Sequence, residues 1–193
     1  LVEQQHLRLG GKRPRDGDTL LHAAGELPGI LVFKAVEADL PQWVIDRLPE
    51  HDETFIRSLG RAMQEPAPLD LPALCSRLVE EVLSATERAC PIRLEAGAMP
   101  GEARGDERLL RHILLNLLTN AVKYSEAGQP VDFIVQRDGP EAVCVVRDRG
   151  IGIPEADQSW LFSAFHRGRN VGQRNGTGLG LVIVKRCVEL HGG

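Results

Sequence analysis

The sequence lacks a hydrophobic run long enough to cross a membrane. A spanning helix needs about 20 apolar residues, whereas the longest clear run, residues 30–33, has the length of a short strand. No signal peptide is visible. Basic residues are not in excess either: 23 Lys and Arg stand against 27 Asp and Glu, and the pI is about 5.9. This balance argues against a surface that binds nucleic acid or anionic lipid.

The sequence also lacks any Cys-x-x-Cys pair. Its four cysteines are widely spaced, whereas a zinc site gathers its ligands from short spacings. We therefore expect buried free thiols in a reducing compartment, and we assign them no function. These cysteines are Cys75, Cys90, Cys144 and Cys187.

The chain divides by composition into three zones. The first, residues 1–53, opens with a polar, basic loop at 10–15 and offers a strand at 29–36 and a helix at 41–48. This is too little apolar material for a large independent core, so we interpret the zone as a small sensing or docking segment. The chain begins with Leu rather than Met and stops without a closing element, and we expect that both ends are cut.

The second zone, residues 54–68, carries apolar side chains at helical spacing between Phe55 and Met63. Pro66 and Pro68 end this helix, because proline lacks the amide donor and clashes with the preceding turn. We interpret the zone as a helix that leads through a stiff linker into a new domain.

The third zone, residues 69–193, alternates helices and strands. The short turn at 138–140 separates two apolar strands, which must then pair antiparallel. We therefore predict an α+β fold, a two-layer sandwich of helices on a sheet, and not a dinucleotide-binding parallel sheet. The predicted helices are 71–88, 106–124 and one each after Pro154 and Gly180, and the predicted strands are 91–95, 131–137 and 142–146.

The helix predicted at 106–124 carries a line of polar residues. His112, Asn116 and Asn120 are four apart, so they share one face, away from the apolar stripe of the helix. An asparagine inside a helix costs roughly half a kcal/mol relative to alanine. The two asparagines are therefore either tolerated solvent-facing residues or part of a site.

Asp148 follows a hydrophobic strand and opens a turn that runs to Pro154. A carboxylate at a strand end can accept a hydrogen bond from an exocyclic amine, and Gly150 and Gly152 let the backbone approach a planar ligand. The alternative is an ordinary connection from strand to helix, in which Pro154 starts the helix.

A second glycine-rich turn, residues 176–181, opens the last predicted helix. Unobstructed backbone N–H groups at a helix start suit phosphate oxygens. The spacing fits neither the dinucleotide-binding nor the P-loop pattern. Between the two turns lies the stretch 161–167, followed by a polar stretch, 168–175, which is a candidate lid over a ligand.

In this order, the pieces resemble the ATP-binding domain of two-component sensor histidine kinases, within the GHKL class of gyrase, Hsp90, histidine kinase and MutL ATPases. The likeness covers residues 69–193. It rests on an N box at 116–124, a first glycine box at 148–154, an F box at 162–165 and a second glycine box at 176–181. It implies a GHKL (Bergerat) sandwich for the third zone, with ATP and Mg²⁺ as cofactors.

The resemblance also implies roles for individual residues. Asn120 would coordinate Mg²⁺ beside Asn116, and Asp148 would read the adenine amino group. Lys123 and Arg167 would meet phosphate oxygens, and with Asn120 they are the candidate catalytic residues. The further residues expected to contact the nucleotide are Tyr124, Gly150, Gly152, Ile153, Phe165, Gly176, Thr177, Gly178, Leu179 and Gly180. Such a site performs phosphoryl transfer by positioning and charge neutralisation.

One position separates transfer from hydrolysis. Family members that hydrolyse ATP are expected to carry a glutamate one turn before the Mg²⁺ asparagine, as general base for water. This sequence has Asn116 there, which cannot abstract a proton. We therefore expect transfer of the γ-phosphate to a histidine outside this chain, and onward to a response regulator, in a homodimeric parent kinase.

No histidine stands fully in the family's phosphoacceptor context, and His51 with Asp52 matches it only in part. Residues 54–68 resemble the end of the second dimerisation helix, and residues 40–53 resemble the membrane-proximal end of a periplasmic sensor. Such a sensor cannot run into a cytoplasmic ATP-binding domain without a span. We therefore expect a splice or gap near residue 53, in a parent protein of the bacterial inner membrane.

Glu50 and Glu53 form a Glu-x-x-Glu pair in that first zone. Carboxylates at i and i+3 of a helix could hold ferric iron or another cation, and the alternative is a solvated acidic helix end. Two further hypotheses stay open for the whole chain: a non-catalytic nucleotide-binding or metal-sensing module, and a serine kinase of the anti-sigma-factor type.

Overall fold

The computed structural model describes residues 3–9, 31–32, 67–97, 103–138, 141–172, 174 and 176–191. Several sequence predictions lie outside these residues, among them the polar loop at 10–15, the helix at 41–48, the helical stripe from Phe55 to Met63, and the candidate cation ligands Glu50 and Glu53.

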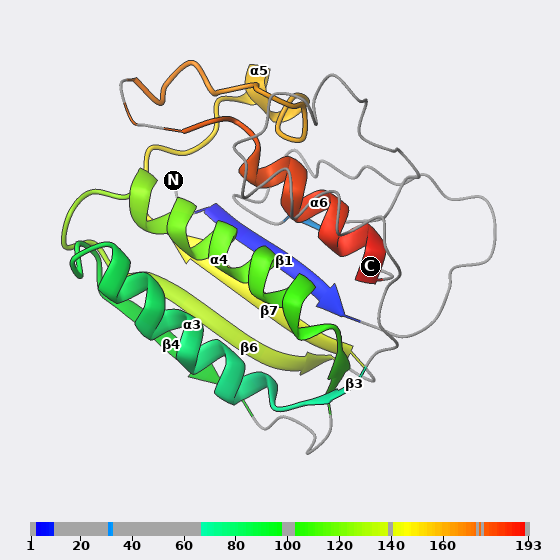
Figure 1. The fold of residues 1–193 in the computed structure, drawn as a ribbon. Coiled ribbons are helices and arrows are strands. Elements are labelled where there is room, and N and C mark those ends of the chain that lie inside the picture. Colours follow the sequence, from blue (N-terminus) through cyan, green and yellow to red (C-terminus); the bar gives the residue numbers. More distant parts are fainter. Residues whose placement is uncertain are drawn as a thin grey trace.

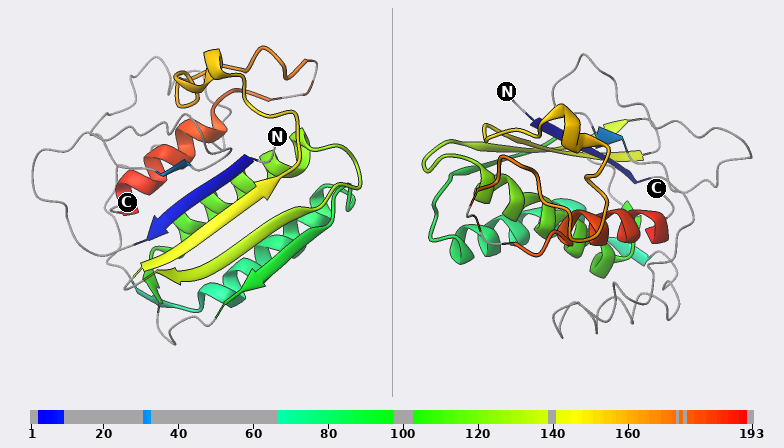
Figure 2. Two further views of the ribbon diagram at one scale, coloured as in Figure 1. Left: turned by 180° about the vertical axis from the view of Figure 1, so that it is seen from behind. Right: turned by 90° about the horizontal axis from the view of Figure 1, so that it is seen from above.

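The described strands form a five-stranded sheet in the order β2-β1-β7-β6-β4. They are β1 (Glu3–Leu9), β2 (Leu31–Val32), β4 (Ile92–Ala96), β6 (Val131–Asp138) and β7 (Glu141–Asp148). One face of this sheet carries the helices α3 (Leu71–Ala85), α4 (Glu107–Tyr124) and α6 (Gly180–His191) (Figures 1 and 2). A small second sheet pairs β3 (Ala67–Leu69) with β5 (Ala103–Gly105). The predicted two-layer α+β sandwich is confirmed.

The core lies between the sheet and these helices. β6 and β7 pair antiparallel, as predicted, with Phe133 opposite Val146 and Val135 opposite Cys144. Because side chains alternate along a strand, these four point to the same face, and all of them are buried in the core. The helices contribute a matching set of fully buried side chains, among them Leu74, Leu78, Ile113, Leu114, Leu118 and Val184.

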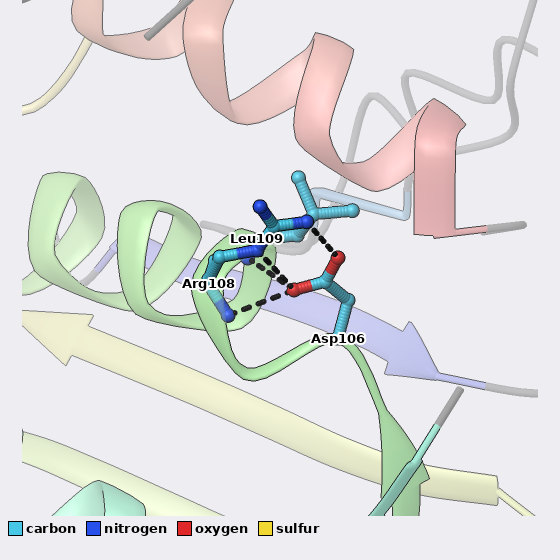
Figure 3. A network of polar contacts seen from close by, with 3 residues as sticks. All are labelled: Asp106, Arg108 and Leu109. Atoms are coloured by element: carbon cyan, nitrogen blue, oxygen red, sulfur yellow. Dashed lines mark hydrogen bonds and ion pairs between the residues drawn. The ribbon is translucent and has the colours of Figure 1, made fainter. Parts of the chain in front are cut away.

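Helix α4 begins where the sequence predicts, because Asp106 caps it. The carboxylate of Asp106 accepts the backbone N–H groups of Arg108 at 2.9 Å and Leu109 at 3.5 Å (Figure 3). It also accepts a hydrogen bond from the guanidinium of Arg108 at 3.0 Å. Burial works to raise the pKa of Asp106, but the hydrogen bonds and the charge of Arg108 outweigh it and hold the pKa below its ordinary value.

Two predicted helices are longer than the observed ones. The helix expected at 71–88 ends at Ala85, because Glu87 and Arg88 take left-handed backbone conformations with φ of 50° and 54°. The N–H of Arg88 then closes the helix end on the carbonyl of Leu83 at 2.8 Å. The helix expected after Pro154 is a single turn, α5 (Glu155–Gln158).

Strand β1 is absent from the sequence prediction. It pairs antiparallel with β7, from Glu3 opposite Asp148 to Leu9 opposite Ala142. Its sequence shows no sustained apolar alternation, so its place depends on backbone pairing with a strand far away along the chain. Part of the first zone therefore shares a sheet with the third zone. The division of the chain at residues 53 and 68 stays a prediction.

All four cysteines are free and buried, as predicted. The contact of Cys144 on β7 with Cys75 on α3, together with burial, raises the pKa of Cys144. Burial raises the pKa of Cys187 to about 12. These two thiols therefore stay protonated and unreactive at neutral pH. Within the described part of the chain, no helix combines the length and the hydrophobicity that a membrane span requires.

Candidate functional site

The polar face of α4 meets the start of α6. The side-chain amide of Asn116 donates to the carbonyl of His112 at 2.9 Å, which leaves its oxygen directed away from the helix backbone. A Cβ built on Gly180 would lie 2.8 Å from Asn116 Oδ1 and 3.8 Å from Asn120 Nδ2. Glycine at the first position of α6 therefore makes room for the two asparagine amides, which are half-buried between the helices and not simply solvent-facing.

A lysine at the end of α4 meets the second glycine-rich turn. A Cβ on Gly176 would lie 2.6 Å from Lys123 Nζ and 3.9 Å from Tyr124 Oη. The ammonium group also lies 5.0 Å from the centre of the Tyr124 ring, a cation–π distance. The turn thus passes directly against a fixed positive charge. Lysine beside unobstructed backbone is an arrangement that suits phosphate oxygens.

Asp148 lies at the end of β7 and is 7% exposed. Its Oδ1 accepts the backbone N–H of Gly150 at 2.8 Å. Burial raises the pKa of Asp148, and this hydrogen bond opposes the rise in part. A buried carboxylate with a second oxygen is a suitable acceptor for an amine of a ligand.

The first glycine-rich turn is fastened to the end of α4. The N–H of Ile151 donates to the carbonyl of Tyr124 at 3.2 Å, and Ser125 forms an isolated bridge with Gly150. A Cβ on Gly150 would lie only 2.5 Å from that carbonyl oxygen, so any side chain at this position would force the backbone to shift. The backbone itself therefore brings Asp148 beside the Lys123–Tyr124 end of α4.

The F box and the second glycine box are also joined. The N–H of Phe165 donates to the carbonyl of Gly178 at 3.2 Å. Both residues have left-handed backbones, with φ of 62° and 74°, and a Cβ on Gly178 would lie 2.7 Å from the carbonyl oxygen of His166. The segment that joins α5 to α6 is thereby closed at its base, next to the C-terminal end of α4 (Figure 1).

Known proteins resemble this chain in sequence and in fold. The family model of histidine kinase-, DNA gyrase B- and HSP90-like ATPases matches residues 105–193. The solved mycobacterial sensor histidine kinase MprB is 30% identical over 66% of this chain and 80% of its own, with a TM-score of 0.57. The chain belongs to this ATPase family. The predicted resemblance is confirmed.

Two further relatives of this ATPase family extend the comparison. The circadian input-output histidine kinase CikA of Synechococcus elongatus is 38% identical over 139 residues, which are 69% of this chain and 18% of CikA. The full-length ShkA structure, in complex with AMPPNP, is 27% identical over 75% of this chain and 35% of its own, with a TM-score of 0.54. The chain spans 18% to 27% of the length of the first curated relatives that it matches.

The residues present fit the nucleotide and Mg²⁺ that the family implies. Amide oxygens of Asn116 and Asn120 are hard ligands of the kind that Mg²⁺ prefers. Gly176 and Gly180 leave space that a Cβ would fill beside Lys123 and Asn116. Of the predicted site residues, the structure brings together Asn116, Asn120, Lys123, Tyr124, Asp148, Gly150, Gly176 and Gly180, and it joins Phe165 to Gly178.

The remaining predicted site residues lie in different surroundings. The side chain of Leu179 is 1% exposed and belongs to the core, so only its backbone can face a nucleotide. The guanidinium of Arg167 donates to the carbonyl of Arg174 within its own loop. Thr177 is exposed, and Gly152 and Ile153 are half-buried in the first glycine turn. The family match does not extend to Glu50 and Glu53.

The sequence analysis missed the residues that hold the loop after the F box. Asn170 Nδ2 donates to the carbonyls of Ile151 at 3.2 Å and Gly152 at 2.8 Å. Asp157 Oδ2 accepts the backbone N–H of Arg169 at 2.8 Å. Both residues stand in polar stretches typical of solvated loops. Only the burial of Asp157, which a sequence does not show, distinguishes it.

Proposed function

We propose that this chain is the ATP-binding catalytic region of a sensor histidine kinase, which holds ATP for transfer of its γ-phosphate to a histidine side chain on another segment. The observation that carries the proposal is the meeting of Asn116, Asn120 and Lys123 on α4 with the glycine turn that starts α6. Family membership and the AMPPNP in the ShkA structure support a nucleoside triphosphate as the ligand.

Each part of the site has one task in this proposal. The free carboxylate oxygen of Asp148 accepts the adenine amine, since Oδ1 is already used by Gly150. Lys123 binds phosphate oxygens together with the backbone of Gly176, and Asn120 holds Mg²⁺ through its amide oxygen. When bound, Mg²⁺–ATP supplies the phosphoryl group and the cation that neutralises its charge.

The site favours transfer over hydrolysis. An amide cannot take a proton from water, and Asn116 stands where a hydrolase needs a general base. Its Nδ2 is also engaged with the carbonyl of His112. In this proposal the residue offers its amide oxygen to the site and activates no nucleophile. The acceptor must instead bring its own nucleophile, such as the imidazole of a histidine.

The parent protein, in this proposal, is a homodimeric membrane kinase that passes the phosphoryl group to a response regulator. Curated relatives with this ATPase domain are named histidine kinases, and the chain covers only part of their length. The phosphoacceptor domain would come from the same kinase. A cation at Glu50 and Glu53 stays a hypothesis about the sensing part.

Calorimetry and phosphotransfer test the proposal in sequence. Wild-type chain should bind AMPPNP with Mg²⁺, whereas Asn120→Ala and Asp148→Asn should bind at least tenfold more weakly. Arg111→Ala is the matched control on α4, because Arg111 is exposed and its partner among the described residues is Glu81, in a surface ion pair worth little. Absence of AMPPNP binding by the wild type would refute the proposal.

Transfer is then measured with γ-labelled ATP and a dimerisation domain supplied as a separate chain. Acid-labile label on that domain is the expected result, since phosphohistidine is acid-labile. Acid-stable label would identify a serine kinase instead. Binding without any transfer would identify a nucleotide-binding module.

A further inference from the structure

Asp157 is a buried carboxylate outside the four family motifs. It lies in α5, and its side chain is 2% exposed. Placing a carboxylate out of water is costly unless hydrogen bonds or charges compensate it. The groups that contact the Asp157 carboxylate therefore show which part of the structure its burial stabilises.

Among the described residues, the hydrogen-bond and ion-pair partners of the Asp157 carboxylate all lie in the loop that follows the F box. Oδ2 accepts the backbone N–H of Arg169 at 2.8 Å. Oδ1 lies 3.8 Å from His166 Nε2 and 3.6 Å from Arg169 Nε. The Arg169 side chain is 83% exposed, so this ion pair contributes little. The hydrogen bond from the backbone N–H of Arg169 is therefore the contact that holds the loop in place.

A second contact holds the same loop from the other side. Asn170 Nδ2 donates to the carbonyls of Ile151 and Gly152 in the first glycine turn. A Cβ on Gly168 would lie 3.1 Å from Asn170 Oδ1 and 3.6 Å from Asp157 Oδ2. The loop is thus packed closely against both side chains at its turn.

Arg167 lies between the two points that Asp157 contacts, His166 and Arg169. We infer that Asp157 is a positioning residue: by binding the backbone N–H of Arg169, two residues after Arg167, and lying beside the His166 side chain just before it, Asp157 sets where the guanidinium of Arg167 can reach the terminal phosphate of ATP. In the present arrangement this guanidinium rests on the carbonyl of Arg174. In this inference Arg167 exchanges that carbonyl for a phosphate oxygen while Asp157 keeps the backbone N–H of Arg169. The inference rests on the proposed function.

The test compares two nucleotides that differ only at the terminal phosphate. Titrations with AMPPNP and with ADP, both with Mg²⁺, are run on wild type, Asp157→Ala, Arg167→Ala and the double variant. We expect Asp157→Ala to weaken AMPPNP binding about tenfold and ADP binding less than twofold, as for a lost charge-assisted contact to one phosphate. The double variant should bind AMPPNP no more weakly than Arg167→Ala, because both changes remove one interaction.

Asp106→Ala is the matched control for a general loss of stability. It removes a buried carboxylate that caps α4 away from the loop, so the ratio of AMPPNP to ADP affinity should stay at the wild-type value. Asp157→Asn retains one oxygen for the N–H of Arg169 and should recover affinity to within about threefold of wild type. Asp157→Asn also replaces Asp157→Ala in the titrations if Asp157→Ala does not fold.

Three results would overturn the inference. They are an equal loss of AMPPNP and ADP affinity in Asp157→Ala, unchanged affinity for both, or additive effects in the double variant. Failure of the wild type to bind either nucleotide is distinguishable from these, because it refutes the proposed function itself.

Discussion

The substitution Gly176→Ala tests nucleotide binding at the candidate phosphate site with little effect on folding. A Cβ at this position would lie 2.6 Å from Lys123 Nζ, whereas ordinary contact begins at 3.4 Å. The obstacle is the far end of a flexible side chain, and Gly176 is exposed. The lysine can therefore retreat by about 0.8 Å at little cost to the fold. We expect the free energy of unfolding to change by less than about 0.5 kcal/mol.

The retreat removes Lys123 from the place where it would meet phosphate. A hydrogen bond to a charged group is worth roughly 1.5–3 kcal/mol, so its weakening should lower AMPPNP affinity about tenfold. A misplacement of about 1 Å can cost up to about 100-fold in rate. Phosphotransfer should therefore fall further than affinity does.

Calorimetry with AMPPNP and urea titration measure the two effects separately. Gly97→Ala is the control, because its Cβ would meet nothing closer than 3.6 Å, and it should change neither quantity. Unchanged AMPPNP affinity in Gly176→Ala would refute the assignment of Lys123 to phosphate. A fall of more than about 1 kcal/mol in the free energy of unfolding would show that Lys123 stabilises the fold.

Three further predictions follow from the same contacts. Gly150→Ala should lower the free energy of unfolding by about 1–3 kcal/mol in urea titrations, because its Cβ would lie 2.5 Å from the rigid backbone carbonyl of Tyr124; wild-type stability would contradict this. Asp106→Ala should cost about 1 kcal/mol at neutral pH through loss of the α4 cap. Because the folded-state pKa of Asp106 is lowered, its carboxylate stabilises the fold above the unfolded pKa of about 3.9, and this stabilisation is lost as the pH falls through the folded pKa. The melting temperatures of the wild type and of Asp106→Ala should therefore converge in acid. Burial raises the pKa of Asp148, so its ionised carboxylate destabilises the fold at neutral pH. This cost declines as the pH falls below the raised pKa and is gone once the pH is below the unfolded pKa of about 3.9. Asp148→Asn should therefore raise the melting temperature at pH 7 but not in acid, and a lower melting temperature at pH 7 would argue against a buried charge.

Local patterns predicted much of the fold. Helix α4 has an apolar stripe, and Asp106 is a capping residue at its start, so propensity, pattern and cap agree. The hairpin of β6 and β7 has alternating apolar residues on either side of a short turn. The candidate site residues Asn116, Asn120 and Asp148 belong to these same elements, in the second half of α4 and at the end of β7, so the local patterns also predicted where they lie.

Other features of the fold have no signal in the local sequence pattern. The place of β1 depends on its pairing with β7, and no apolar pattern announces it. The end of α3 depends on left-handed backbone at Glu87 and Arg88, which glycine usually supplies. Asp157 looks like any acidic residue near a helix start, and its partners appear only once the loop has folded back.

The pairing of β1 with β7 has a consequence for synthesis of the chain. The blue strand at one end of the sequence lies beside the yellow strand that follows it by more than a hundred residues (Figure 1). Loop closure over such a distance is slow, and β1 leaves the ribosome long before its partner exists. The edge of β1 that pairs with β7 therefore stays without its partner while the residues between the two strands are synthesised. The sheet that supports Asp148 is completed only when β7 emerges and pairs with β1.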